Sequence, residues 1–117
     1  MLLQDGPAST TIDSMVVDAR SDAGALLKLL GEPLRWEIVR RLAVEDLCTC
    51  HLASDLGAAQ PLLSHHLRVL RQAKVVRTER VGAFTYYVLN RDVPSDLAGV
   101  LSDLATAPAQ PRRRPCS

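Results

Sequence analysis

The chain has 117 residues, of which 47 % are hydrophobic, and a formal net charge of +1 at pH 7. This length and composition fit one domain with one core. No run of residues approaches the roughly 18 apolar positions that a membrane helix needs, and the amino terminus lacks the basic-then-apolar pattern of a secretion signal, so we expect a cytoplasmic protein with no membrane partner.

Two helices are predicted in the first part of the chain. Residues 1–20 form an amino-terminal arm that we expect to be partly disordered or helical. A first helix is predicted from Ser21 or Asp22 to near Gly31, and a second helix is predicted from Pro33. Their apolar positions are Leu26, Leu27, Leu29, Leu30, Leu34, Ile38 and Leu42.

Two cysteines, Cys48 and Cys50, stand directly before a short third helix, which is predicted from His51 to Leu56 and is ended by Gly57. The chain has three cysteines, an odd number, and this pair is too close in sequence to close a stabilising loop. We therefore expect reduced thiols rather than a disulfide framework.

A fourth helix is predicted to begin at Pro61, after a tight turn, and to complete a helix-turn-helix unit. Helical spacing gives it an inward face of Leu63, Leu67 and Leu70. Its outward face carries Leu62, Ser64, His65, Arg68 and Arg71. His65 and His66 are adjacent and point about 100° apart, so they do not form a metal pair. We expect His66 to be packed or hydrogen-bonded.

Two β-rich runs, Val75–Arg80 and Phe84–Leu89, predict a hairpin. A hairpin that follows a reading helix is a wing. A last helix is predicted with Asp92 or Ser95 as its cap, and its apolar stripe suits a partner helix better than a long core. The stripe consists of Leu97, Val100, Leu101 and Leu104.

The predicted fold is mainly α with a small β-hairpin. It is a winged helix-turn-helix over residues 21–105 that forms a homodimer through its terminal helices. Residues 106–117 form a basic, proline-rich tail without periodicity, and we expect this tail to be flexible.

The basic charge is concentrated in one part of the chain. Residues 1–22 carry four Asp and one Arg, whereas residues 60–80 carry five Lys or Arg and one Glu. A basic stripe that coincides with a helix and a hairpin indicates phosphate contact rather than general solubility.

These elements resemble the ArsR/SmtB family of winged-helix metal-responsive repressors, from about Leu26 to Leu104. The resemblance is carried by residues 31–35 (Gly-Glu-Pro-Leu-Arg), the helix at 60–70 and the wing at 82–87, and most sharply by residues 46–52, Asp-Leu-Cys-Thr-Cys-His-Leu. That segment is similar to the Glu-Leu-Cys-Val-Cys-Asp-Leu signature of the arsenic-sensing and the cadmium- or lead-sensing branches. The resemblance implies a dimeric repressor that leaves its operator DNA when an inducer binds.

The position of the cysteine pair decides whether it can hold an ion. Positions i and i+2 point about 200° apart inside a regular helix and could not grip one ion there. With Cys48 near the N-cap and Cys50 in the first turn, the sulfurs can converge, and the unpaired backbone N–H groups favour thiolate. Thiolates select soft ions, and trivalent arsenic or antimony prefers three of them. The alternative is that both cysteines are small apolar fillers of the core.

The resemblance leaves the third ligand open. Close arsenic sensors often have a further cysteine where this chain has Ala53, and cadmium and lead sensors use cysteines of an amino-terminal arm, whereas this chain has none before Cys48. The last helix lacks the histidines of the zinc sensors. Cys116 is the remaining thiol and the candidate third ligand, from its own or the partner chain. We expect His51 to be an exposed first-turn residue rather than a fourth donor.

The resemblance also assigns DNA contacts. The residues that enter the major groove are Gln60, Leu62, Ser64, His65 and Arg68. Gln can pair with adenine there, and Leu62 can pack on a thymine methyl. Arg71 and Arg80 meet phosphates, which set register and salt dependence. The residue after Gly82 is often basic in the family and is Ala83 here, which weakens insertion of the wing tip into the minor groove. The alternative is a set of solvated charges on an ordinary helix.

We therefore predict a metalloid-responsive transcriptional repressor that needs no cofactor to bind DNA. Arsenite or antimonite is expected to bind the cysteine thiolates, draw the two sulfurs together and deform the start of the third helix. The alternatives are a cadmium- or lead-responsive repressor of the same family, or a thiol redox sensor that responds to peroxide. We expect no enzyme, because the cysteine spacing differs from thioredoxin-like sites and no Ser/His/Asp set, phosphate loop or paired carboxylate site is visible.

Overall fold

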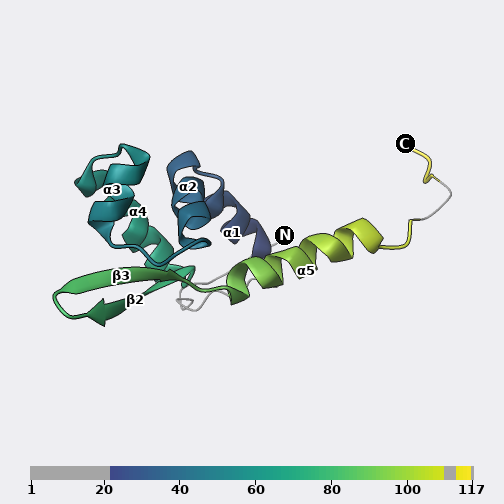
Figure 1. The fold of residues 1–117 in the computed structure, drawn as a ribbon. Coiled ribbons are helices and arrows are strands. Elements are labelled where there is room, and N and C mark those ends of the chain that lie inside the picture. The colour runs from purple at the N-terminus through teal and green to yellow at the C-terminus, as the bar shows by residue number, and fades with distance from the viewer. Residues whose placement is uncertain (1–21, 110–112, 117) are drawn as a thin grey trace.

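The computed structural model describes residues 22–109 and 113–116, so the arm predicted at residues 1–20 lies outside the described part. Figure 1 shows short helices packed into one body, a hairpin along one side of it, and a last helix that extends away. In chain order the elements are α1 (Ala23–Leu30), α2 (Pro33–Leu42), α3 (Thr49–Leu56), α4 (Gln60–Gln72), β2 (Val76–Val81), β3 (Phe84–Leu89) and α5 (Asp92–Thr106). In the described ranges, no helix combines the length and the hydropathy needed to cross a bilayer.

The ends of the helices follow from local chemistry. Helix α2 begins with Pro33, whose missing N–H costs nothing at that position, and the Glu32 carboxylate accepts a 2.9 Å hydrogen bond from the Arg35 backbone N–H. Helix α3 begins after its N-cap residue Cys48 and ends at Gly57, which adopts the left-handed conformation with φ of 62°. The short turn that follows places α4 across α3 as a helix-turn-helix unit.

The core is aliphatic. All three residues assigned to the inward face of α4, Leu63, Leu67 and Leu70, are fully buried. The other side chains with less than 2 % exposure are Leu26, Ile38, Leu42, Leu52 and Val75. The core therefore lies between α1, α2, α3 and α4 and the base of the hairpin, and it fixes the face that α4 turns outward.

The wing is a two-stranded antiparallel hairpin in which Val76 pairs with Leu89 and Val81 pairs with Phe84. The first strand lies one residue later than predicted, because Val75 is buried at the turn into the hairpin instead of in the strand. Gly82 has φ of 60° and stands first in the two-residue turn, as a type II′ turn requires.

Helix α5 leaves the body as an arm (Figure 1). Val93 and Leu97 near its start are buried, whereas Leu101 and Leu104 further along are 47 % and 73 % exposed. The predicted stripe is therefore core at one end and open surface at the other. Three predicted helix starts were wrong by one or two residues: α3 begins at Thr49 instead of His51, α4 begins at Gln60 instead of Pro61, and Asp92 is the first residue of α5 instead of its cap. The fold is a mainly helical winged helix-turn-helix.

Candidate functional site

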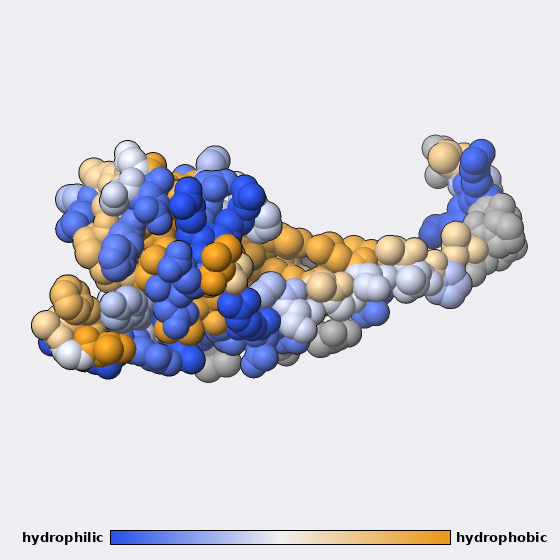
Figure 2. Space-filling model, viewed as in Figure 1, coloured by the Kyte–Doolittle hydropathy of each residue, from blue (hydrophilic) through white to orange (hydrophobic). Residues whose placement is uncertain are grey.

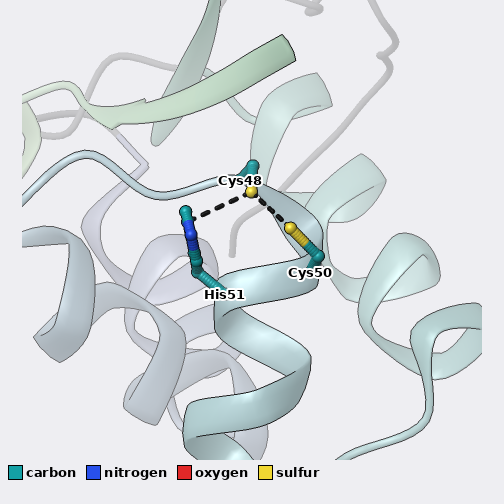
Figure 3. A group of neighbouring side chains, drawn as sticks. All are labelled: Cys48, Cys50 and His51. Atoms are coloured by element: carbon teal, nitrogen blue, oxygen red, sulfur yellow. Dashed lines mark hydrogen bonds between the residues drawn. The ribbon is translucent and has the colours of Figure 1, made fainter.

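The two adjacent cysteines converge at the start of α3 (Figure 3). Cys48 is the N-cap residue with extended backbone angles, φ −88° and ψ 167°, and Cys50 lies in the first turn. This change from extended to helical backbone turns both side chains to one side, and their Sγ atoms lie 2.7 Å apart. A disulfide bond would be about 2.05 Å long; both residues are free cysteines, Cys48 buried and Cys50 exposed.

A histidine completes the cluster. His51 Nδ1 lies 3.1 Å from Cys48 Sγ, and the ligand atoms of Cys48, Cys50 and His51 all lie within 4.8 Å of one another. His51 is exposed, as expected from its place in the first turn, but its ring faces the thiols (Figure 3). Cys48 is the N-cap residue and His51 the third helical residue, so the two side chains lie at the same end of α3, and this spacing was the signal in the sequence for a third donor.

The two thiols differ in acidity. A hydrogen bond from the Cys50 thiol lowers the pKa of Cys48, and backbone N–H groups at the start of α3 lower it further against the opposing effect of burial. The same hydrogen bond raises the pKa of Cys50, with burial and the Cys48 charge acting in the same direction. Cys48 is therefore the first thiolate of the site, and Cys50 is the thiol that loses its proton when a second sulfur donor is needed.

The structure does not bring the third predicted ligand to this cluster within one chain. Cys116 is an exposed free cysteine in the tail beyond α5, and that tail lies at the opposite end of the molecule from α3 (Figure 1). Its predicted role as a ligand, supplied by the same or a partner chain, stays a prediction.

The thiol cluster is connected to both DNA-facing elements. On the carboxyl side, α3 packs against α4, with Leu52 of α3 fully buried in the shared core. On the amino side, Leu47 pairs with Tyr87 of β3: the Tyr87 N–H donates to the Leu47 carbonyl at 2.8 Å, and the reciprocal bond measures 3.3 Å. A movement at Cys48 therefore has a direct structural path to the reading helix and to the wing.

The predicted DNA-contacting side chains share the outer side of α4 and the wing. The exposed residues are Gln60, Leu62, Ser64, His65, Arg68, Arg71 and Arg80. Leu62 is a large apolar side chain with 48 % exposure, which suits contact with a base methyl group. Arg80 donates a 3.4 Å hydrogen bond from Nε to the Gly82 carbonyl, so its guanidinium lies folded along the wing tip.

A buried polar cluster sets the position of α4 on the body. His66 has only 7 % exposure, as expected for a packed residue, and Arg35 Nη1 donates to its Nδ1 at 3.0 Å. Arg35 also donates from Nε to the Leu29 carbonyl at 2.7 Å. Burial lowers the pKa of His66, so this ring is a neutral acceptor that ties the α1–α2 corner to the middle of α4.

A winged helix-turn-helix with a basic, exposed reading helix defines a class of proteins, the DNA-binding regulators. Comparison with known proteins agrees. The family model described as bacterial regulatory protein, arsR family, matches residues 32–78. The arsenical resistance operon repressor of Staphylococcus aureus is 31 % identical over 86 residues, which cover 74 % of this chain and 83 % of that protein.

Two further matches show the range of the relatives. The HTH-type transcriptional repressor SmtB of Mycobacterium tuberculosis is 42 % identical over 67 residues, 57 % of this chain and only 50 % of that protein. The crystal structure of a possible transcriptional regulator for arsenical resistance has a TM-score of 0.59 at 29 % identity and covers 67 % of this chain and 81 % of that chain. The chain belongs to the ArsR family and is a DNA-binding transcriptional repressor, not an enzyme.

Proposed function

We propose that this repressor senses a thiophilic metal or metalloid ion, with arsenite or antimonite as the inducer that Cys48 and Cys50 bind. The observation that carries the proposal is the convergence of two free sulfurs, 2.7 Å apart, at the first turn of the helix that supports the reading helix. One of the two has a lowered pKa, and thiolate is the form that soft ions bind.

Trivalent arsenic and antimony fit this donor set because they prefer sulfur ligands. Cys116 of the same or a partner chain is the proposed third sulfur. One observation favours a second candidate: His51 Nδ1 stands 3.1 Å from Cys48 Sγ, and a set of two sulfurs and one imidazole nitrogen also suits a divalent ion of borderline softness. Cadmium or lead is therefore the alternative inducer.

We infer a mode of response that differs from the expected one. The sulfurs already lie 2.7 Å apart without an ion, so an inducer would not need to draw them together. Two sulfurs that each bond one metal ion at about 2.3 Å stand further apart than this. Binding would spread Cys48 and Cys50 and displace the start of α3. A coupling of about 1 to 3 kcal/mol between ion and DNA, or about 5- to 150-fold in affinity, is enough for release.

We further propose that the repressor acts as a homodimer through α1 and α5, because a single reading helix cannot match a twofold operator. An apolar groove runs between α2 and the start of α5 and is lined in part by Leu27, Trp36, Leu97 and Leu101. Figure 2 shows hydrophobic surface continuing along α5 from the helical body. Trp36 is 49 % exposed, so it is a surface residue available to a partner rather than a core residue.

The test is release of promoter DNA from the native protein by arsenite, antimonite, cadmium, lead, zinc and peroxide in separate titrations. Release by arsenite or antimonite at the lowest concentration supports the first candidate. Preferential release by cadmium or lead that is lost in His51→Ala supports the second. Release by peroxide alone would show a redox sensor, and no release by any of them would contradict ion sensing.

A further inference from the structure

The carboxyl-terminal end of α4 gathers cationic side chains for which the described part of the chain supplies no ion-pair or hydrogen-bond partner. Some arginines elsewhere on the described surface lie close to carboxylates: Arg41 is 3.6 Å from Asp55, and Arg77 is 3.0 Å from Glu79. Within residues 22–109 and 113–116, no such ion pair or side-chain hydrogen bond is formed by three exposed cations at the end of α4. These are Arg68, Arg71 and Lys74.

These unpaired side chains surround one hollow. Its lining consists of Arg68, Arg71, Gln72 and Lys74 and contains no acidic residue. Arg68 lies one helical turn beyond Ser64, and Gln72 one turn beyond Arg68, so the hollow continues the outward face of α4. Like charges held around one hollow repel each other unless an anion lies between them. The hollow therefore has the charge and the place of an anion site beside the reading surface.

The backbone of Lys74 gives a second, independent observation. Lys74 has φ of 66°, and among the described residues it is the one non-glycine residue with positive φ. The turn is fixed, because the Lys74 N–H donates to the Arg71 carbonyl and Asn90 Nδ2 donates to the Lys74 carbonyl, both at 3.0 Å. Glycine adopts this conformation without strain. A left-handed residue commonly follows the end of a helix and is usually glycine or asparagine. A lysine at this position carries a conformational cost that glycine would not, and its side chain adds charge to the hollow.

We infer that this hollow binds a phosphate of the DNA backbone and that Lys74 is a DNA-anchoring residue. The inference rests on the DNA-binding part of the proposed function and not on its inducer. It also changes the role of Arg68, which lines the hollow and therefore anchors the backbone instead of reading a base edge. Gln72 supplies an amide donor that can complete the binding of a phosphate oxygen.

The experiment uses Lys74→Gly, Lys74→Arg and, as a matched control, Lys28→Ala, which removes an exposed cation from α1. Binding to a labelled mixed-sequence duplex is measured by fluorescence anisotropy over a range of salt concentrations, because phosphate contacts do not depend on sequence. Loss of one phosphate contact should weaken binding of Lys74→Gly about eightfold near 0.1 M salt and reduce the slope of log K against log salt by about 0.9. Lys74→Arg and Lys28→Ala should bind like the native protein.

A thermal unfolding midpoint measured on the same samples separates binding from folding. Lys74→Gly relieves the strained backbone, so its midpoint should stay level or rise while its DNA affinity falls. Native affinity and slope in Lys74→Gly would overturn the inference. So would saturable binding of inorganic phosphate that needs Lys74 while duplex binding does not. The Cys48→Ser/Cys50→Ser protein should show the same dependence on Lys74, so failure here and failure of the sensing proposal are distinguishable.

Discussion

Leu47 and Tyr87 exchange two backbone hydrogen bonds, 2.8 Å and 3.3 Å long, and so join the residue before the thiol cluster to the second strand of the wing. Tyr87 also packs against the core. Cys48 follows Leu47 directly and is the N-cap residue of α3. The wing is therefore hydrogen-bonded to the residue that precedes the start of α3. A rearrangement of the thiols can therefore reach two DNA-contacting elements at once.

This bridge predicts a change in hydrogen exchange. Arsenite binding should alter the exchange rate of the Tyr87 amide, because its acceptor lies next to the residue that moves. The Gly31 amide, which donates to the Leu27 carbonyl on α1, is the control and should keep its rate. Exchange measured by NMR with and without arsenite checks this. An unchanged Tyr87 amide would remove the wing from the proposed path.

The acidity of the thiols predicts the effect of Cys50→Ala. The largest cause of the lowered pKa of Cys48 is the hydrogen bond from Cys50. Removing that donor should raise the pKa of Cys48 toward the ordinary value of about 8.5. Thiolate absorbance in a Cys116→Ser background, followed against pH, reports this titration without the tail cysteine. A Cys48 thiolate that forms at the same pH in Cys50→Ala would show that the helix end alone sets its acidity.

His66 predicts a dependence of stability on pH. Burial lowers the pKa of His66 in the folded state, so the unfolded chain binds more protons between that lowered value and about 6.5. The free energy of unfolding should therefore fall as pH drops through this window and rise again as pH increases. His66→Gln should reduce the dependence, whereas His65→Gln, at an exposed neighbouring position, should keep it. Urea unfolding at several pH values tests both variants.

Substitutions of base-reading residues and of phosphate-anchoring residues should have different effects on sequence preference and on salt dependence. Gln60→Ala should lower affinity for operator DNA by about 1 to 3 kcal/mol and relax the preference at one base pair, while the salt dependence stays the same. Arg71→Ala should weaken binding to every sequence and reduce the salt slope by about 0.9. Binding to the operator and to single-base variants over a salt range distinguishes them. Equal losses of sequence preference in both variants would contradict this division.

The proposed dimer predicts the effect of a charge on α5. Leu101 lines the apolar groove with 47 % exposure, and Leu101→Glu would bury an unpaired carboxylate in each half of the interface. The dimer should weaken by more than about tenfold, as measured by sedimentation equilibrium. Ser102→Glu adds the same charge at the neighbouring exposed position, which does not line the groove, and should leave the dimer intact. Equal behaviour of the two variants would place the interface elsewhere.

Periodicity and cap chemistry predicted much of this fold. The inward face of α4, the buried His66 and the place of Cys48 at the N-cap all follow from spacing along a helix, which depends on local sequence. The residue at which a helix begins is less certain from sequence alone, because a residue such as Thr49 suits a turn or a first helical position equally well. This is why α3 began two residues earlier than predicted.

Other features depend on three-dimensional packing. The turn of the His51 ring toward the thiols depends on a side-chain rotamer that residue type does not determine. The positive φ of Lys74 is imposed by hydrogen bonds from Asn90 and to Arg71, the first of which spans sixteen residues of sequence. Lysine carries no local preference for that conformation, so only the folded chain reveals it.

The most direct test of ion sensing compares arsenite-driven release of operator DNA from the native protein, from Cys48→Ser/Cys50→Ser, and from Cys116→Ser as a control for loss of a cysteine outside the cluster. The double variant should bind DNA with native affinity and should not be released at arsenite concentrations that release the native protein. Undiminished release from the double variant would contradict ion sensing by this pair.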